Sequence, residues 1–167
     1  MIALKIIDNK DFMSNLLKGN TFDTFWLSEA VITTFNTFTI DGNMHLEFFD
    51  PVLAKSLESS GRTNSYWAEI KPFCFSIIKG KHTPLNFKII FQLSREHMEQ
   101  ALENSDTGLL PENVAGMFLN LQFNGTEITC TTGTSLRLFT LDKSLDVLWD
   151  NMVLAFFKQH GIAFEQL

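Results

Sequence analysis

Phenylalanine is the residue that most constrains this chain. The 167 residues include 17 Phe but a single Tyr, and 45% are hydrophobic while only 19% are charged. Large aromatic rings without a polar group must be removed from water, so such a sequence has to fold around a core and cannot remain disordered. The length is that of one ordinary domain. We therefore expect residues 1–167 to form a single domain with one core.

The sequence shows no export signal and no membrane-spanning segment. The first four residues are apolar but lack a basic stretch and a cleavage site, and the most apolar helix candidate, residues 145–157, contains Asp146 and Asp150. Cys74 and Cys130 have no CxxC spacing, which favours reduced thiols over a disulfide. These features predict a cytoplasmic protein that does not enter a membrane.

Hydrophobic periodicity and capping residues divide the chain into helices and strands. Apolar residues at helical spacing predict four helices, the second kinked at Pro72, over residues 9–18, 65–79, 94–104 and 143–160. Runs of β-branched and aromatic residues predict strands over residues 1–7, within 24–49, over 85–93, around 119–130 and over 135–141. Residues 51–64 are expected to form a polar connection with one helical turn.

Two turn sequences predict hairpins and their strand pairing. At residues 41–43, Asp-Gly-Asn, a three-residue loop keeps the apolar side chains on one face by pairing Ile40 with Met44. At Asn124-Gly125, a two-residue turn separates apolar from polar faces by pairing Leu121 with Ile128. We therefore expect one hairpin in each half of the chain.

The order strand, helix, hairpin occurs in pseudo-halves at about residues 1–50 and 85–141, linked by the helix at 65–79 and closed by the helix at 143–160. It predicts an α+β fold in which an antiparallel sheet from two pseudo-repeated halves is covered by helices. This order resembles the repeat unit of sliding-clamp-like folds, although the helices lack the basic stripe of a DNA-encircling surface. An unrelated α+β arrangement is the alternative.

Cationic residues gather in one segment of an acidic chain. Residues 62–95 contain six Lys or Arg against Glu69 alone, a net charge of +5; the whole chain carries −6, so the other residues carry −11. A local positive surface can bind an anion or an acidic partner. The alternative is six solvated side chains that point in different directions. The candidate anion-binding residues are Lys71, Lys79, Lys81, His82 and Lys88.

The stretch IIKGKHTP, residues 77–84, has two interpretations. A helix end explains most of it, because Gly80 can close a helix in the αL conformation, lysines favour the C-terminal end of the helix dipole, and Pro84 prevents continuation. His82 and Thr83 are not needed for this purpose. An anion-binding loop therefore depends on them and on the neighbouring lysines.

No common catalytic or cofactor motif is present. The sequence contains no GxxxxGK[ST], GxGxxG, HExxH or GxSxG, and its four histidines have no metal-ligand spacing with either cysteine. Both cysteines fall on apolar faces and are expected to be small core residues. We assign no catalytic residue, no cofactor and no metal.

Two polar clusters have structural explanations. Asp142, Asp146 and Asp150 share one helix face, as metal ligands could, but acidic residues near a helix N-terminus also stabilise its dipole. Residues 131–135, Thr-Thr-Gly-Thr-Ser, could cradle an anion, but a glycine bulge between strands explains them more simply. Neither cluster is chosen as a site.

Three segments resemble an uncharacterised family of small proteins, a domain of unknown function from Gram-positive anaerobic bacteria. They are FNTFTIDG at 35–42, WAEIKPFCFSIIKGKHTPLNFKI at 67–89 and TTGTSLRLFTLDKSLDVLWD at 131–150. The resemblance implies a bacterial, cytoplasmic setting. It supplies no activity and no site residues.

Three functions remain open. A non-catalytic protein-interaction or assembly module ranks first, because catalytic motifs are absent and the composition is apolar; its partner is another protein or a second copy. A binder of small anions or nucleic acid through residues 62–95 ranks second. An enzyme with a dispersed site ranks third.

Overall fold

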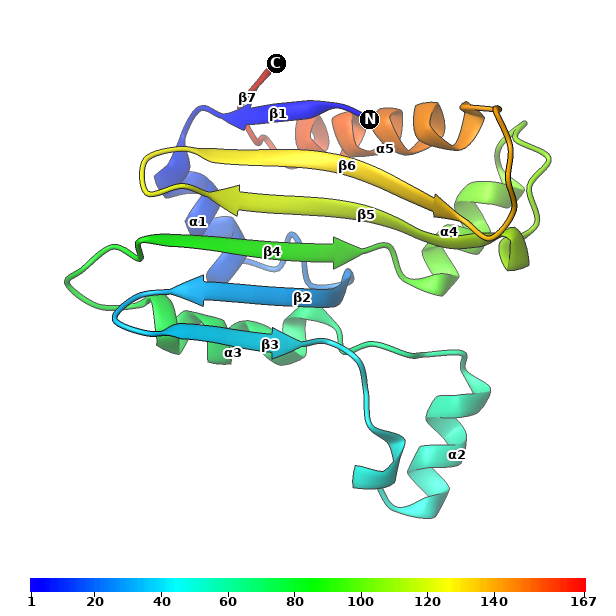
Figure 1. Cartoon of the computed structure of the whole chain (residues 1–167), viewed down its shortest axis with the longest axis horizontal. Coiled ribbons are helices and arrows are strands. Elements are labelled where there is room, and N and C mark those ends of the chain that lie inside the picture. Colours follow the sequence, from blue (N-terminus) through cyan, green and yellow to red (C-terminus); the bar gives the residue numbers. More distant parts are fainter.

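A computed structural model describes residues 1–167. Seven antiparallel strands form one sheet in the order β3-β2-β4-β5-β6-β1-β7 (Figure 1). The strands are β1 Ala3–Ile6, β2 Trp26–Thr33, β3 Thr37–Asp41, β4 Asn86–Gln92, β5 Val114–Phe123, β6 Ile128–Leu136 and β7 Phe164–Gln166. The helices are α1 Asn9–Leu17, α2 Pro51–Ser59, α3 Trp67–Ile78, α4 Arg95–Glu103 and α5 Ser144–Gln159, with short 3₁₀ turns η1 Leu46–Phe48 and η2 Pro111–Asn113.

The sheet has one covered face and one open face. Helices α1, α3, α4 and α5 lie behind it in Figure 1, whereas α2 stands apart beyond β3. The alternation of β4 follows this arrangement: Phe87, Ile89 and Phe91 are buried, whereas Asn86 and Lys88 are exposed. The predicted α+β class and antiparallel sheet are confirmed.

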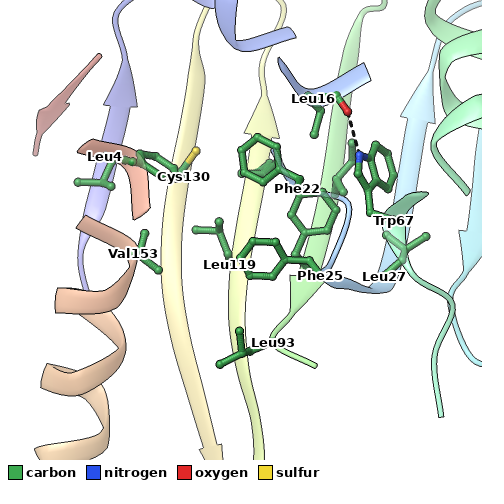
Figure 2. Packing of buried hydrophobic residues seen from close by; sticks show 14 of the residues in the cluster. Leu4, Leu16, Phe22, Phe25, Leu27, Trp67, Leu93, Leu119, Cys130 and Val153 are labelled. Carbon is green, nitrogen blue, oxygen red and sulfur yellow. Dashed lines mark hydrogen bonds between the residues drawn. The ribbon is translucent and has the colours of Figure 1, made fainter. Parts of the chain in front are cut away.

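Aromatic rings hold the helices to the covered face. The Phe91 ring lies 5.1 Å from Trp67, 5.5 Å from Phe22 and 5.6 Å from Phe25, measured between centroids. The indole N–H of Trp67 donates to the carbonyl of Leu16 at 2.8 Å (Figure 2). The polar atom of this fully buried ring is thereby satisfied, as burial requires.

The order strand, helix, hairpin occurs twice, as β1-α1-β2-β3 and β4-α4-β5-β6. The two sets interlock, because β2 and β3 lie on one side of β4-β5-β6 while β1 pairs with β6 on the other. Pseudo-symmetry between the halves, and the likeness to sliding clamps, stay predictions.

The turn predicted at residues 41–43 is wrong. β2 and β3 are joined at residues 34–36, and Ile40 pairs with Ala30 rather than with Met44. Gly42 does not form a turn; it allows its backbone to lie close to the backbone of Leu27. A Cβ at this position would lie 1.8 Å from the carbonyl oxygen of Leu27. A glycine needed for packing therefore resembles a glycine needed for turning.

The second hairpin lies where the turn sequence predicted it, but with a longer loop. Phe123 pairs with Ile128 and Leu121 with Cys130, so four residues form the loop and the register differs by two from the expected one. The Asn124 side chain explains the loop, since its Oδ1 accepts from the backbone N–H groups of Thr126 and Glu127. A shift of two preserves the faces, so the expected separation of apolar and polar side chains still holds.

Four further expectations are corrected. The strand predicted over 135–141 ends at Leu136, and residues 131–135 lie inside β6 rather than in a bulge, because the chain pairs continuously with β5 there. Residues 51–64, expected as a connection with one helical turn, contain the nine-residue helix α2. Gly80 has a positive φ, but at 142° it lies away from the αL value, and α3 ends at Ile78, followed by Lys79 in extended backbone.

Gly42→Ala is expected to lower the free energy of unfolding by about 2 kcal/mol or more, because the added methyl group meets backbone that cannot move independently. Gly133→Ala is the control: it lies in β6, and no heavy atom lies within 4 Å of the position that its added methyl group would take. Urea denaturation measures both. Equal free energies of unfolding for the two variants would show that the close contact between Gly42 and Leu27 tolerates a side chain, which would contradict this prediction.

Candidate functional site

The basic segment 62–95 does not form one positive surface. Four of its six cations are in ion pairs: Arg62 with Glu69, Lys71 with Asp23, Lys88 with Glu29 and Arg95 with Glu99. Three of these four acids come from outside the segment. The charge of +5 is therefore largely balanced by residues that the linear sequence places elsewhere.

Lys71 and Lys88 lie apart from the other candidate anion-binding residues. Lys71 Nζ donates to Asp23 Oδ1 at 2.6 Å and to the carbonyl of Gly19 at 2.7 Å, so it ties α3 to the segment after α1. Lys88 is an exposed residue of β4, with its Nζ 3.3 Å from Glu29 Oε2 on the neighbouring β2. Neither lines the hollow that the remaining three candidates share.

Lys79, Lys81 and His82 line a hollow of about 390 Å³ between the α3–β4 loop and the β2–β3 turn. We call it the loop hollow; its other lining residues are Thr34, Phe35, Ile77, Gly80, Thr83 and Leu85. Neither lysine is in an ion pair. The Thr34 hydroxyl is shielded from solvent and has no hydrogen-bond partner. Anion binding at this hollow stays a prediction.

A projecting element that the sequence analysis missed lies beyond the edge of the sheet. Residues 45–60, which we call the arm, comprise η1 and α2, and α2 stands apart from the sheet (Figure 1). No residue of η1 or α2 is buried. A helix-start signal was present: Asp50 caps α2 by accepting from the Leu53 N–H at 2.9 Å, and Pro51 occupies the first turn. The polar residues that follow obscured it.

The arm exposes large apolar side chains. Phe48 is 85% exposed, Val52 82% and Leu53 43%. Leu46, Phe49, Ala54 and Leu57 are half-buried, and the rings of Phe48 and Phe49 meet edge to face at 5.5 Å. The arm therefore exposes three large apolar side chains, those of Phe48, Val52 and Leu53, which this chain does not cover; we refer to these three residues as the apolar patch of the arm.

The arm leaves the body from a fixed base. The Asn64 side-chain amide donates to the carbonyl of Leu27 at 2.9 Å, and Asn64 is buried. The Met44 N–H donates to the Thr63 carbonyl and the Ser65 N–H to the Gly42 carbonyl, each at 2.9 Å. These hydrogen bonds join the segment that enters the arm to the segment that leaves it. The base of the arm is therefore fixed relative to the sheet.

The cysteines and aspartates have structural roles. Cys74 and Cys130 are fully buried, as expected of core residues, and burial raises the pKa of the Cys74 thiol to about 12 and that of Cys130 further still. Asp146 and Asp150 accept hydrogen bonds from the hydroxyls of Thr134 and Thr132, which fixes α5 to β6. No group of three His, Cys, Asp or Glu side chains has a metal-binding arrangement. None of the helices has the length and apolar character that a bilayer crossing needs.

Lys81→Ala combined with His82→Ala is expected to abolish salt-sensitive binding of polyphosphate if the loop hollow binds anions, with little change in the melting temperature because both residues are exposed. Lys158→Ala, an exposed lysine in α5, is the control for loss of charge alone. Titration at low salt measures the affinities. Absence of wild-type binding below millimolar concentration would contradict the prediction.

Comparison with known proteins identifies a family. No curated protein and no solved structure matches the chain. The sequence model of a family of unknown function (DUF5721) matches residues 15–165, which span all five helices except the start of α1, and six of the seven strands in full or in part. The chain therefore belongs to this family of unknown function.

Proposed function

We propose that this protein is a non-catalytic interaction module and that the arm is the part that docks on another protein. The observation that carries the proposal is that α2 buries none of its nine residues, while Phe48 and Val52 are more than four-fifths exposed. Isolated helices shorter than ~12 residues are marginally stable in water. A short helix with an uncovered apolar patch gains stability when a partner covers that patch.

The charges of the arm indicate the chemistry of its partner. The arm contains three acidic residues and one cation, so its net charge is −2 with neutral histidine; they are Glu47, Asp50, Glu58 and Lys55. A helix of this kind fits an apolar groove edged by Lys or Arg, in the helix-in-groove mode of recognition. Opposite charges at the rim would speed association and make it sensitive to salt.

Titratable groups support a non-catalytic role. The two large pKa increases, at Cys74 and Cys130, arise from burial in the core and not from a cleft where a substrate could reach the thiols. Anion or nucleic-acid binding at the loop hollow is the second candidate function, supported by the two unpaired lysines that line it. An enzyme with a dispersed site is the third.

The proposed setting is the cytoplasm of a Gram-positive anaerobic bacterium. Two free, fully buried cysteines suit a reducing compartment, where thiols are not joined into disulfides. The partner would accordingly be a cytoplasmic protein.

A photo-crosslinking amino acid at Phe48 in living cells is expected to capture one protein that the same group at Phe139 does not capture. Phe139 is the matched control because it is 90% exposed in a loop remote in sequence from the arm. The captured protein, once purified, should bind the wild-type chain. Phe48→Ala combined with Val52→Asp should weaken that binding on the order of tenfold or more, whereas Phe139→Ala should not.

Phe48 and Val52 are both exposed, so the free energy of unfolding of the double variant should lie within about 0.5 kcal/mol of the wild-type value. Equal capture from both positions, or unchanged affinity of the double variant, would contradict the proposed function. Capture of a second copy would instead identify self-association, and light scattering would then show a mass that increases with concentration unless Val52 is replaced by Asp.

A further inference from the structure

A second hollow lies where the base of the arm meets the end of the sheet. It encloses about 240 Å³, and we call it the sheet-end hollow. Its walls come from the start of β2, the segment that returns from the arm, the end of β4, the first turns of α4, η2, the start of β5 and the residue after β6. The residues that matter for its chemistry are Trp26, Gln92, Arg95, Met98, Glu112 and Arg137.

Trp26 is the exception among the three tryptophans. The indole N–H of Trp67 donates to the Leu16 carbonyl at 2.8 Å, and that of Trp149 donates to the Phe118 carbonyl at 2.7 Å. Trp26 is only 5% exposed, yet its indole N–H has no acceptor. A buried donor without a partner is rare in folded proteins, and an acceptor from outside the chain, either an ordered water or a ligand, would satisfy this one.

Two guanidinium groups line the same hollow, and each has N–H groups that make no hydrogen bond within the protein. Arg137 is held by Nη1, which donates to the carbonyls of Glu112 at 3.1 Å and Val114 at 2.9 Å; its Nε and Nη2 have no protein acceptor. Arg95 donates through Nε to Glu99 at 2.9 Å, which leaves both terminal nitrogens free. Guanidinium donors of this geometry match the two oxygens of a carboxylate.

The charge and the apolar surface of the lining together restrict the class of ligand that fits. The lining contains two arginines and one acid, Glu112, a net charge of +1, and Glu99 outside the lining offsets part of this charge by pairing with Arg95. So weak a positive charge suits a monoanion better than a dianion. Leu93, Met98 and Val114 supply apolar walls. A ligand with one carboxylate and an apolar body would satisfy both features.

We infer that the sheet-end hollow binds a small organic monocarboxylate, whose oxygens accept from Arg95, Arg137 and the indole N–H of Trp26. The indole N–H is shielded from solvent by its neighbours. Binding therefore requires lining side chains to move. Gln92, which pairs with Trp26 across the β2–β4 ladder, and Arg95 are the long, flexible side chains best suited to do so. This inference does not depend on the function of the arm.

Nuclear magnetic resonance of the indole N–H groups tests the inference, because the three tryptophans provide internal controls. Benzoate, titrated into the ¹⁵N-labelled chain, should shift the Trp26 indole signal saturably and leave those of Trp67 and Trp149 in place. Trp26→Phe assigns the signal. Benzamide has the same ring without the charge and should cause no shift, and phenyl phosphate, a dianion near Glu112, should bind more weakly than benzoate.

Arg95→Gln should weaken benzoate binding on the order of tenfold, because it removes a charged pair of donors. Arg137→Gln should have an equal or larger effect; unchanged Trp67 and Trp149 signals verify that each variant is folded. Lys81→Ala, at the loop hollow, should bind as the wild type does. No saturable Trp26 shift, equal shifts of all three indoles, or equal binding of benzamide would overturn the inference. Tighter binding of phenyl phosphate would overturn the choice of a carboxylate.

Discussion

The burial of Trp67 at the start of α3 is the contact on which the other features of this fold depend. Its indole donates to the Leu16 carbonyl in α1 and its ring packs on Phe91 of the central strand β4, while its backbone N–H donates to the Phe25 carbonyl at 2.9 Å. One residue thus joins two helices and the sheet. Since α3 begins where the chain returns from the arm and ends at the loop hollow, this anchor positions both candidate surfaces.

Phenylalanine rings are removed from water in the core of the body, whereas the ring of Phe48 in the arm remains exposed. In the body, Phe22, Phe25 and Phe91 remove their rings from water by packing on one another beneath the sheet. In the arm, Phe48 makes contact with Phe49 but stays 85% exposed, because a nine-residue helix offers too little surface to cover it. The same residue type that requires a core in one place therefore indicates a partner in the other.

Electrostatics follows spatial neighbours rather than sequence neighbours. Lys71 and Lys88 belong to a run of cations, but Asp23 in the α1–β2 connection pairs with Lys71, and Glu29 pairs with Lys88 across the β2–β4 ladder. Lys79 and Lys81 lie in a loop where no acidic residue pairs with them. Arg95 and Arg137, far apart in the chain, are brought to one hollow by the β4–α4 turn and the end of β6. Charge counts along the chain therefore located one candidate hollow and missed the other.

Local interactions made part of this structure readable from the amino-acid order. Ser94 caps α4, Asp8 caps α1, and Gly161 closes α5 with a φ of 65°, each through hydrogen bonds between residues a few positions apart. Alternation likewise assigned the faces of β5 and β6, since a register shift of two leaves every side chain on its own face. The role of Gly42, the projection of the arm and the unpaired indole of Trp26 could not be read in this way. Gly42 depends on the Leu27 backbone that lies opposite it, the arm on how far it projects from the sheet, and the Trp26 indole on which acceptors the fold places around it. These relations are set by packing across the whole sheet.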